Sequence, residues 1–339
     1  MEASTKSPVE APTIAFLHRV IVASVLAVLT IVGLFGNALV IFSVITTKKL
    51  RTVTNMLVVN LAFADILTCF SLAFQIAGLL SQTGRYPIPE FICAIVAGVT
   101  ATSVCCSVSN LVAIGFVRWY VITRSIRGHQ GLNTPRNIAK VVLIIWMESI
   151  ALMIIPPALG VGTFGYYRYY GLCSLSETNP LAFVNFIFQG AVIITALILT
   201  LVFYGLILRH VLQHNKQFRD KFADDKATGS SSAEAQKKNA SSSTSQDSSQ
   251  PMIKAINQKE IEITKNVFIV VCIFMICFVA QGVNSIDTGA GLSTLYGVMI
   301  MMANSVVNPI IYGLKHPNFQ EAFKSILCRR HRPLERVSN

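Results

Sequence analysis

The chain has 339 residues, of which 53% are hydrophobic and 13% charged, and its formal net charge is +12. A water-soluble protein of this length carries about a quarter charged residues, so the composition argues against a soluble enzyme or a soluble binding domain. We expect no nucleic-acid partner despite the positive charge, because the basic residues gather beside apolar segments on one side of a membrane.

Seven apolar segments follow one another along the chain, and each exceeds the roughly 20 residues that cross about 30 Å of hydrocarbon. The sequence therefore predicts an all-α membrane protein, a seven-transmembrane helix bundle, rather than a large soluble protein with buried helices. We expect the first segment to be a retained helix, because no small-residue cleavage site precedes it. The segments cover approximately residues 20–46, 54–81, 91–122, 137–159, 181–212, 262–284 and 292–314.

The distribution of basic residues predicts the orientation of the bundle. Only four of the 28 Lys and Arg side chains, namely Lys6, Arg19, Arg85 and Arg168, fall on the side that we assign to the outside. We expect a multi-pass protein of the plasma membrane, with residues 1–19 as an extracellular amino-terminal tail. The basic residues of the cytoplasmic side would also attract anionic membrane lipids.

Cytoplasmic segments differ in composition from the transmembrane domain at residues 20–314. Residues 213–257 are polar and rich in serine, and we expect a disordered loop there. Residues 315–328 place aromatic and aliphatic side chains on one helical face, which predicts a short amphipathic helix on the inner leaflet. Cys328 ends this helix and is a candidate for palmitoylation, or else an unmodified thiol. Residues 329–339 form the cytoplasmic tail.

Two of the eight cysteines fall at the outer face, which is the oxidising side of the membrane. Cys93 opens the third segment and Cys173 precedes the fifth, so we expect a disulfide between them. In the chain-entropy model such a bridge is worth roughly 4–5 kcal/mol, and less when the helices are already held in a bilayer. The cysteines within apolar segments are expected to stay free.

Asp65 lies near the middle of the second segment, where inserting a carboxylate costs on the order of 3 kcal/mol. In the folded bundle it needs polar partners, and hydroxyl and amide side chains lie at a matching depth in other segments. Such a set could hold a small hard cation, for which we expect sodium, or it could form a hydrogen-bonded structural cluster around a protonated Asp65. The expected partners are Asn37, Ser107, Asn304, Ser305 and Asn308.

Arg118 ends the third segment at the cytoplasmic side. It could simply extend to the lipid headgroups, or it could be a switch residue. As a switch it would pair with Glu260 in the inactive state and turn toward Tyr204 and Tyr312 in the active state. Pro309 removes a backbone hydrogen bond from the seventh segment, which suits a helix that must deform during such a transition.

Together these residues resemble the rhodopsin-like (class A) family of G-protein-coupled receptors, over about residues 20–328. The matching residues are Gly36-Asn37, the run from Asn60 to Asp65, Cys93, Arg118, Trp146, Cys173, Tyr204 and the run from Asn308 to Tyr312, followed by Phe319. The resemblance implies a receptor rather than an enzyme, with a sixth helix that swings outward to admit a heterotrimeric G protein. It also implies a sodium site around Asp65, with arrestin and a receptor kinase as further partners.

The sequence departs from the family pattern near two switch positions. The acidic residue before the switch arginine is Val117 here, so we expect a weakened inactive state and raised basal signalling. The sixth segment has Phe278 where the family usually has a tryptophan, and the proline two residues later is absent, so Phe278 would replace this toggle residue only in part. These departures keep open a non-signalling or atypical receptor-like scaffold.

The expected ligand cavity is apolar with a few neutral amides and hydroxyls, which suits a small neutral or lipid-like ligand. Thr100 stands where the amine receptors of the family resemble one another, and its neutral side chain cannot form an ion pair with an ammonium group. Met302 stands where visual pigments of the family hold a Schiff-base lysine, and the seventh segment has no lysine, so we expect no covalent retinal. A non-covalent chromophore or a hormone stays open, since the stretch from Phe164 to Tyr167 is similar to the melatonin-receptor and opsin-like side of the family. The expected lining residues are Thr100, Ala101, Val104, Phe188, Gln189, Gln281, Asn284, Ser285, Val298 and Met302.

A transporter or channel is the main alternative from another class of membrane protein. It predicts internal repeats and a continuous polar path. The sequence shows no such repeat, and its buried polar residues form one cluster, so a receptor is favoured.

Overall fold

The computed structural model describes residues 14–124, 134–176, 178–229 and 291–328, together with Phe268, Cys272 and Met275. This part of the chain contains six spans that are long and apolar enough to cross a membrane, and they agree within a few residues with six of the seven predicted segments. The remaining predicted segment, the sixth in chain order (262–284), lies outside the described residues except at three positions. The spans are formed by α1 (Phe16–Thr46), α2 (Val53–Leu80), α3 (Glu90–Arg124), α4 (Pro135–Ala158), α5 (Ala182–Gly229), and by α7 (Gly291–Met302) together with α8 (Asn304–Lys315).

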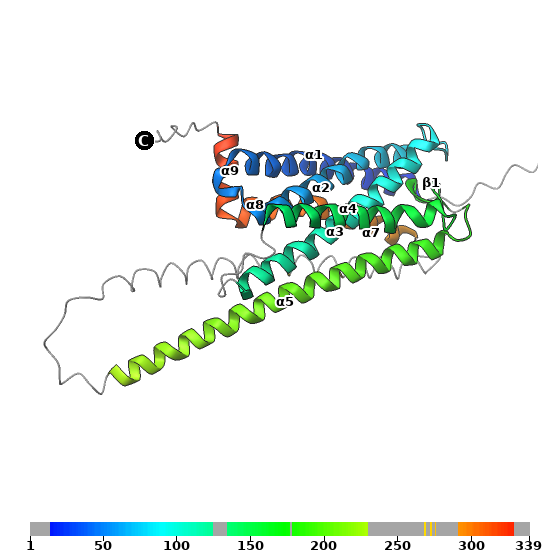
Figure 1. The fold of residues 1–339 in the computed structure, drawn as a ribbon. Coiled ribbons are helices and arrows are strands. Elements are labelled where there is room, and N and C mark those ends of the chain that lie inside the picture. Colours follow the sequence, from blue (N-terminus) through cyan, green and yellow to red (C-terminus); the bar gives the residue numbers. More distant parts are fainter. Residues whose placement is uncertain are drawn as a thin grey trace, which may run out of the picture.

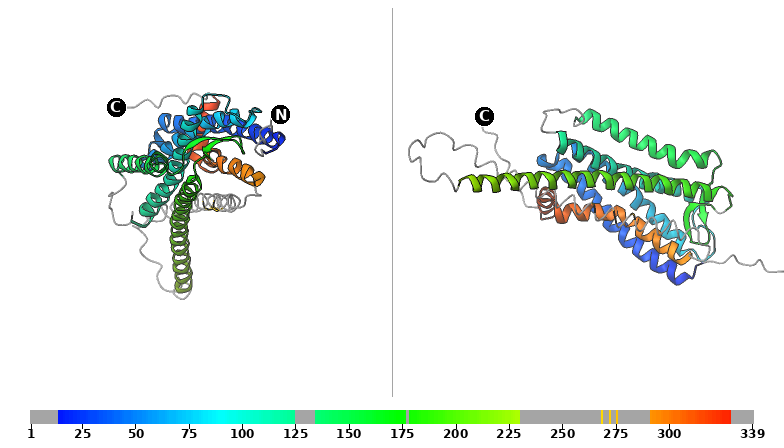
Figure 2. Two further views of the ribbon diagram at one scale, coloured as in Figure 1. Left: turned by 90° about the vertical axis from the view of Figure 1, so that its right-hand side faces the viewer. Right: turned by 90° about the horizontal axis from the view of Figure 1, so that it is seen from below.

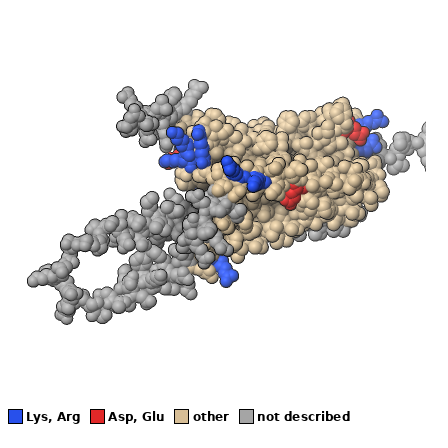
Figure 3. All heavy atoms as spheres, in the orientation of Figure 1, with Lys and Arg blue, Asp and Glu red and all other residues tan. Residues whose placement is uncertain are grey.

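The helices lie side by side in an elongated bundle (Figure 1). α2 packs against both α1 and α3, and α3 also packs against α4 and α5, so α2 and α3 form the centre of the bundle. The end-on view in Figure 2 places α4 and α5 at its periphery. Figure 3 shows a side surface made largely of uncharged residues, with most Lys and Arg side chains near the two ends. This is the surface that a lipid bilayer would cover.

α5 extends well beyond the bundle and ends at Gly229 (Figure 1). The disordered loop predicted for 213–257 is therefore wrong over residues 213–229, which are helical. This stretch has no apolar run that periodicity could detect. It also has no proline, and its one glycine stands at the end, so a helix that starts in the membrane can continue through it.

The last predicted segment is divided into two helices, α7 and α8, which meet at Ala303. Pro309 has no backbone N–H, so the carbonyl of Ser305, four residues earlier, loses its partner within the helix. The side-chain nitrogen of Asn37 donates to that carbonyl oxygen at 2.8 Å. The polar residue of α1 thus replaces the hydrogen bond that the proline removes, and it joins α1 to α8.

A hairpin that the sequence analysis did not predict connects α4 and α5. Its strands, β1 (Phe164–Tyr167) and β2 (Leu172–Leu175), pair antiparallel, with Tyr166 opposite Cys173. Cys173 forms a disulfide with Cys93 at the start of α3, with an S–S distance of 2.03 Å. The predicted disulfide is confirmed, and it fixes the hairpin against the outer ends of α2 and α3.

Arg19 is buried near the outer end of α1, with 5% of its surface exposed. Its Nη2 atom donates to the carbonyl oxygens of Gly78 at 3.1 Å and Ser81 at 2.6 Å, at the end of α2. The hydroxyl of Tyr166 donates to the same Gly78 oxygen at 3.0 Å. Because the carbonyls at a helix C-terminus carry partial negative charge, a cation is favourable there. These bonds connect α1, α2 and the hairpin.

The short helix predicted for 315–328 is present as α9 (Pro317–Leu327), which crosses the end of the bundle beside α1 (Figure 1). Phe319 is buried, and its ring stacks on that of Tyr312 with centroids 5.1 Å apart. Cys328 follows the helix and is exposed.

Candidate functional site

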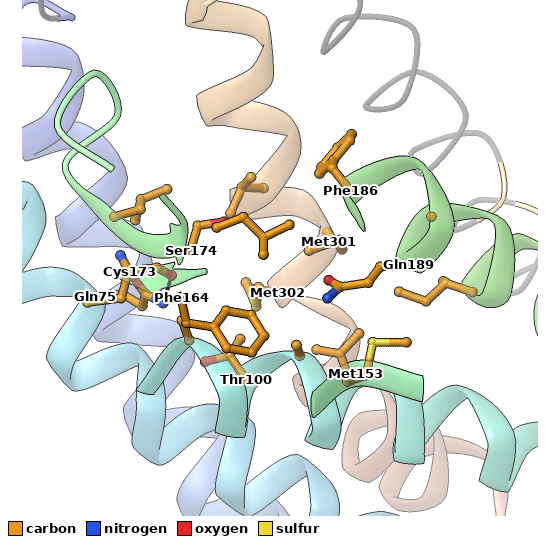
Figure 4. A pocket seen from close by; sticks show the side chains of 18 of the residues that line it. Gln75, Thr100, Met153, Phe164, Cys173, Ser174, Phe186, Gln189, Met301 and Met302 are labelled. Atoms are coloured by element: carbon orange, nitrogen blue, oxygen red, sulfur yellow. Dashed lines mark hydrogen bonds between the residues drawn. The ribbon is translucent and has the colours of Figure 1, made fainter. Parts of the chain in front are cut away.

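A cavity of about 480 Å³ lies in the outer part of the bundle, next to the hairpin (Figure 4). Its size falls in the range of roughly 300–1,000 Å³ that is typical of ligand pockets. Helices α1 to α5, the hairpin and α7 all contribute to it. The described lining residues are mostly apolar, and none of them is Asp, Glu, Lys or Arg.

Most of the ligand residues expected from the sequence lie around this cavity. Phe188 is different: it is 40% exposed on α5 and does not line the cavity. Since successive helix residues point about 100° apart, Phe188 cannot share the direction of Gln189. Gln281, Asn284 and Ser285 lie outside the described residues. The expected residues that do line the cavity are Thr100, Ala101, Val104, Gln189, Val298 and Met302.

Sequence reasoning missed the contributions of the hairpin and of α2. Phe164, Leu172 and Cys173 bring hairpin side chains to the cavity, and Gln75 comes from α2. The side chain of Gln75 donates to the backbone oxygen of Cys173 at 2.9 Å and accepts from its nitrogen at 2.7 Å. A glutamine in an apolar helix was the available sequence indication, but its partner lies 98 positions away.

The carboxylate of Asp65 forms a second polar site deeper in the bundle. Asp65 is fully buried, and its two oxygens accept hydrogen bonds from Ser107 at 2.8 Å and Asn308 at 2.9 Å. The hydroxyl of Ser305 is a further partner. Asn304 is buried in the same turn of α8, but no hydrogen bond from it to Asp65 occurs among the described residues. The structure thus brings three of the predicted partners onto one carboxylate.

This cluster has the composition of a site for a small hard cation. One carboxylate and the hydroxyls of Ser107 and Ser305 supply oxygen atoms, which such ions prefer. Asn37 donates to the backbone oxygen of Ser305, and its own side-chain oxygen is buried and lacks a partner among the described residues. Groups of three or more His, Cys, Asp or Glu, which transition metals prefer, do not occur in the described part of the chain.

Arg118 lies near the C-terminal end of α3, on the side predicted to be cytoplasmic, and its charge acts on Tyr312 of α8. Tyr204 of α5 is 2% exposed and also has an electrostatic influence on Tyr312. The Tyr204 ring lies beside α3, because a Cβ atom at Gly115 would be 3.3 Å from it. Three of the predicted switch residues therefore lie in one region between α3, α5 and α8, whereas Glu260 and Phe278 lie outside the described residues.

Two further residues define the surroundings of Arg118. Val117 is 3% exposed and packs in the apolar core between α2, α3 and α4, so this position provides no carboxylate for the arginine. His316 follows α8, and its Nδ1 atom is buried without a partner in the described part of the chain. Burial lowers the pKa of His316, and the positive charge of Arg118 lowers it further.

A third set of polar residues links α2, α3 and α4. The indole nitrogen of Trp146 donates to the side chain of Asn60 at 2.9 Å, and Asn60 donates to that of Asn110 at 2.9 Å. The sequence analysis treated Trp146 only as part of a family pattern, and its hydrogen bond to Asn60 gives it a specific role in helix packing.

Comparison with known proteins adds an independent finding. The profile described as "7 transmembrane receptor (rhodopsin family)" matches residues 36–312. The chain is 26% identical to Opsin-1 of Schistocerca gregaria, with 90% of this chain and 77% of that protein covered. It is 27% identical to somatostatin receptor type 5 of Rattus norvegicus, with 88% and 75% covered. The crystal structure of squid rhodopsin superimposes with a TM-score of 0.75 at 18% identity, covering 94% of this chain and 88% of that one.

Proposed function

The chain belongs to the rhodopsin family of seven-transmembrane receptors, and from this premise we propose that it couples a small neutral or lipid-like ligand in the outer cavity to heterotrimeric G proteins. The observation that carries the proposal is that Arg118, Tyr204 and Tyr312, which come from three different helices, lie in one region of the bundle. A guanidinium next to two phenols can exchange partners when these helices shift, which is what a two-state switch needs.

The test needs no agonist. Purified receptor in nanodiscs is mixed with a panel of purified G proteins, and guanine-nucleotide exchange is measured without ligand. We expect exchange on at least one G-protein class and a loss of about 10-fold or more in Arg118→Ala. Arg136→Ala, an exposed arginine at the start of α4, is the matched control and should retain the wild-type rate. Absence of exchange on every class would favour the non-signalling scaffold that Val117 and Phe278 keep open.

Val117 gives the proposal a second test, because an apolar residue beside Arg118 offers no counter-charge. We propose that basal exchange is raised for this reason. Val117→Asp should lower ligand-free exchange several-fold, provided that its melting temperature shows a folded protein. Unchanged exchange in a folded Val117→Asp variant would remove the explanation.

The opsin relatives raise the question of a retinal ligand, because opsins usually bind retinal covalently. Met302 lines the cavity of this chain, and a thioether cannot form a Schiff base. We therefore propose a reversible ligand, which could still be a chromophore or a hormone. After incubation with 11-cis retinal and borohydride, the mass of the wild-type protein should be unchanged, whereas Met302→Lys should gain a retinyl group. A retinyl adduct on wild-type protein would contradict the proposal.

Other expectations from the sequence remain proposals. They comprise sodium as an allosteric ligand at Asp65, arrestin and a receptor kinase as further partners, and insertion into the plasma membrane with residues 1–19 outside. The receptor domain would span 20–314. Cys328, exposed after α9, would be the palmitoylation site.

A further inference from the structure

We propose that the outer cavity binds a molecule with an apolar body and one neutral hydrogen-bond acceptor, such as a carbonyl oxygen, and that the side-chain amide of Gln189 binds this acceptor. The biological meaning of the proposal rests on the proposed receptor function. Its physical basis is the hydrogen bonding of the polar groups that line the cavity.

Two of the polar lining residues are already satisfied by the protein. Both ends of the Gln75 amide are paired with the backbone of Cys173. The hydroxyl of Thr100 donates to the carbonyl oxygen of Val96 at 2.7 Å. The Thr100 hydroxyl has no further donor, and the Gln75 amide is held at both its oxygen and its nitrogen by the hairpin backbone.

Gln189 differs from them. Its Nε2 atom is buried and has no hydrogen-bond partner in the described part of the chain. Figure 4 shows its amide turned into the cavity, on the side of Met302. A buried donor without an acceptor is costly and rare in folded proteins, so its persistence here points to an acceptor supplied by another molecule.

The residue one turn earlier on the same face of α5 repeats the pattern. Asn185 is fully buried, and both of its side-chain amide atoms lack a partner among the described residues. The outer part of α5 therefore carries more amide groups than the described protein satisfies. The polar end of the ligand is expected at α5 rather than at α7.

Charge and polarisability narrow the ligand class. The described lining residues include no charged side chain, so a carboxylate or ammonium in the cavity would be desolvated without a counter-charge. Met153, Met301 and Met302 contribute thioethers, which pack well against aromatic and unsaturated groups. A neutral aromatic or polyene ketone fits these conditions.

Benzophenone and diphenylmethane form a matched pair of probes, because they differ only in a carbonyl group in place of a methylene. Their binding is followed by the melting temperature of purified receptor in nanodiscs at graded probe concentrations. We expect wild-type protein to bind benzophenone about 10-fold more tightly than diphenylmethane. In Gln189→Leu this preference should vanish, while the melting temperature without probe should rise because a buried unpaired donor has been removed.

Gln82→Leu is the matched control, since it removes an exposed glutamine that does not line the cavity, and it should keep the preference for benzophenone. If Gln189→Leu does not fold, Gln189→Met provides the same test with an unbranched side chain. Equal shifts from the two probes, no shift from either, or an equal loss of preference in Gln82→Leu would overturn the proposal. No G protein is present in this assay, so its outcome is separate from that of the nucleotide-exchange test.

Discussion

The outer cavity and the Asp65 cluster lie in the same bundle but differ in how their polar groups are paired. Both carboxylate oxygens of Asp65 accept hydrogen bonds from side chains of other helices. In the cavity, the buried nitrogen of Gln189 has no partner in the described structure. A fully paired cluster stabilises one arrangement of helices, whereas an unpaired group is available to a molecule from outside.

The two regions also differ in what holds them together. The cavity is bounded on its outer side by a hairpin that a disulfide attaches to α3 and that hydrogen bonds of the Gln75 and Tyr166 side chains attach to α2. The Asp65 cluster depends on side-chain hydrogen bonds between α2, α3 and α8. Substitutions in one region should therefore leave the properties of the other largely intact, and the following predictions test this separation.

The largest loss of stability is expected from Cys93→Ser, which removes the covalent attachment of the hairpin to α3. Loss of a native disulfide typically costs about 2–5 kcal/mol. The melting temperature should fall strongly and benzophenone binding should weaken, while the response of the remaining folded protein to sodium persists. Cys328→Ser, at an exposed free cysteine, is the control and should behave as wild type. A Cys93→Ser protein with unchanged stability would contradict the role assigned to the bridge.

A smaller loss of stability is expected from Asp65→Ala, which leaves the buried hydroxyl of Ser107 and the half-buried amide of Asn308 without their acceptor. An unpaired buried group costs about 1–3 kcal/mol, and the half-buried Asn308 amide costs less than the buried Ser107 hydroxyl, so the loss should be roughly 2–4 kcal/mol. The melting temperature of wild-type protein should rise with sodium chloride relative to potassium chloride at equal ionic strength, and Asp65→Ala should abolish this difference. The preference for benzophenone should survive. If sodium still stabilised the variant, Asp65 would not be the cation ligand.

The next effect concerns Arg19, which connects α1 to the end of α2. Arg19→Leu removes its two hydrogen bonds to Gly78 and Ser81 and should cost about 1–3 kcal/mol. Amide hydrogen exchange should quicken in the hairpin at residues 164–175 and stay unchanged in α8. Arg85→Leu, on the same outer side, is the control. Equal protection of the hairpin in Arg19→Leu and wild type would show that Arg19 does not help to hold it.

The smallest expected effect is a pH dependence of the protein's stability, and it comes from His316 at the end of the bundle opposite the cavity. The pKa of His316 is lowered in the folded protein, so near the ordinary histidine pKa of about 6.5 the unfolded chain binds more protons. Stability should therefore fall as the pH drops below that value, and it should level off below the folded-state pKa. His316→Gln should flatten this slope in melting experiments, and Asn318→Ala should preserve it. A slope of the same size in His316→Gln would assign it to another group.

The features that the sequence predicted are those that depend on neighbouring residues. The apolar runs predicted the six spans that the structure describes. The position of Asp65 within one of these runs indicated a buried polar site, and the polar residues at a matching depth in other runs included most of its partners. The hairpin, the burial of Arg19 and the pairing of Gln75 with Cys173 depend on contacts between residues far apart in the chain. Phe188 shows a further limit, because an error of one residue in helix phase turns a side chain by about 100° and moves it out of the cavity.

Met302 faces the cavity from α7 in the position where a lysine would give visual-pigment chemistry (Figure 4). Methionine has a single codon, and replacing its middle base with adenine turns it into a codon for lysine. The reversible binding proposed for this receptor and the covalent attachment of an aldehyde are therefore one nucleotide apart, and genomes of close relatives can be read at that base.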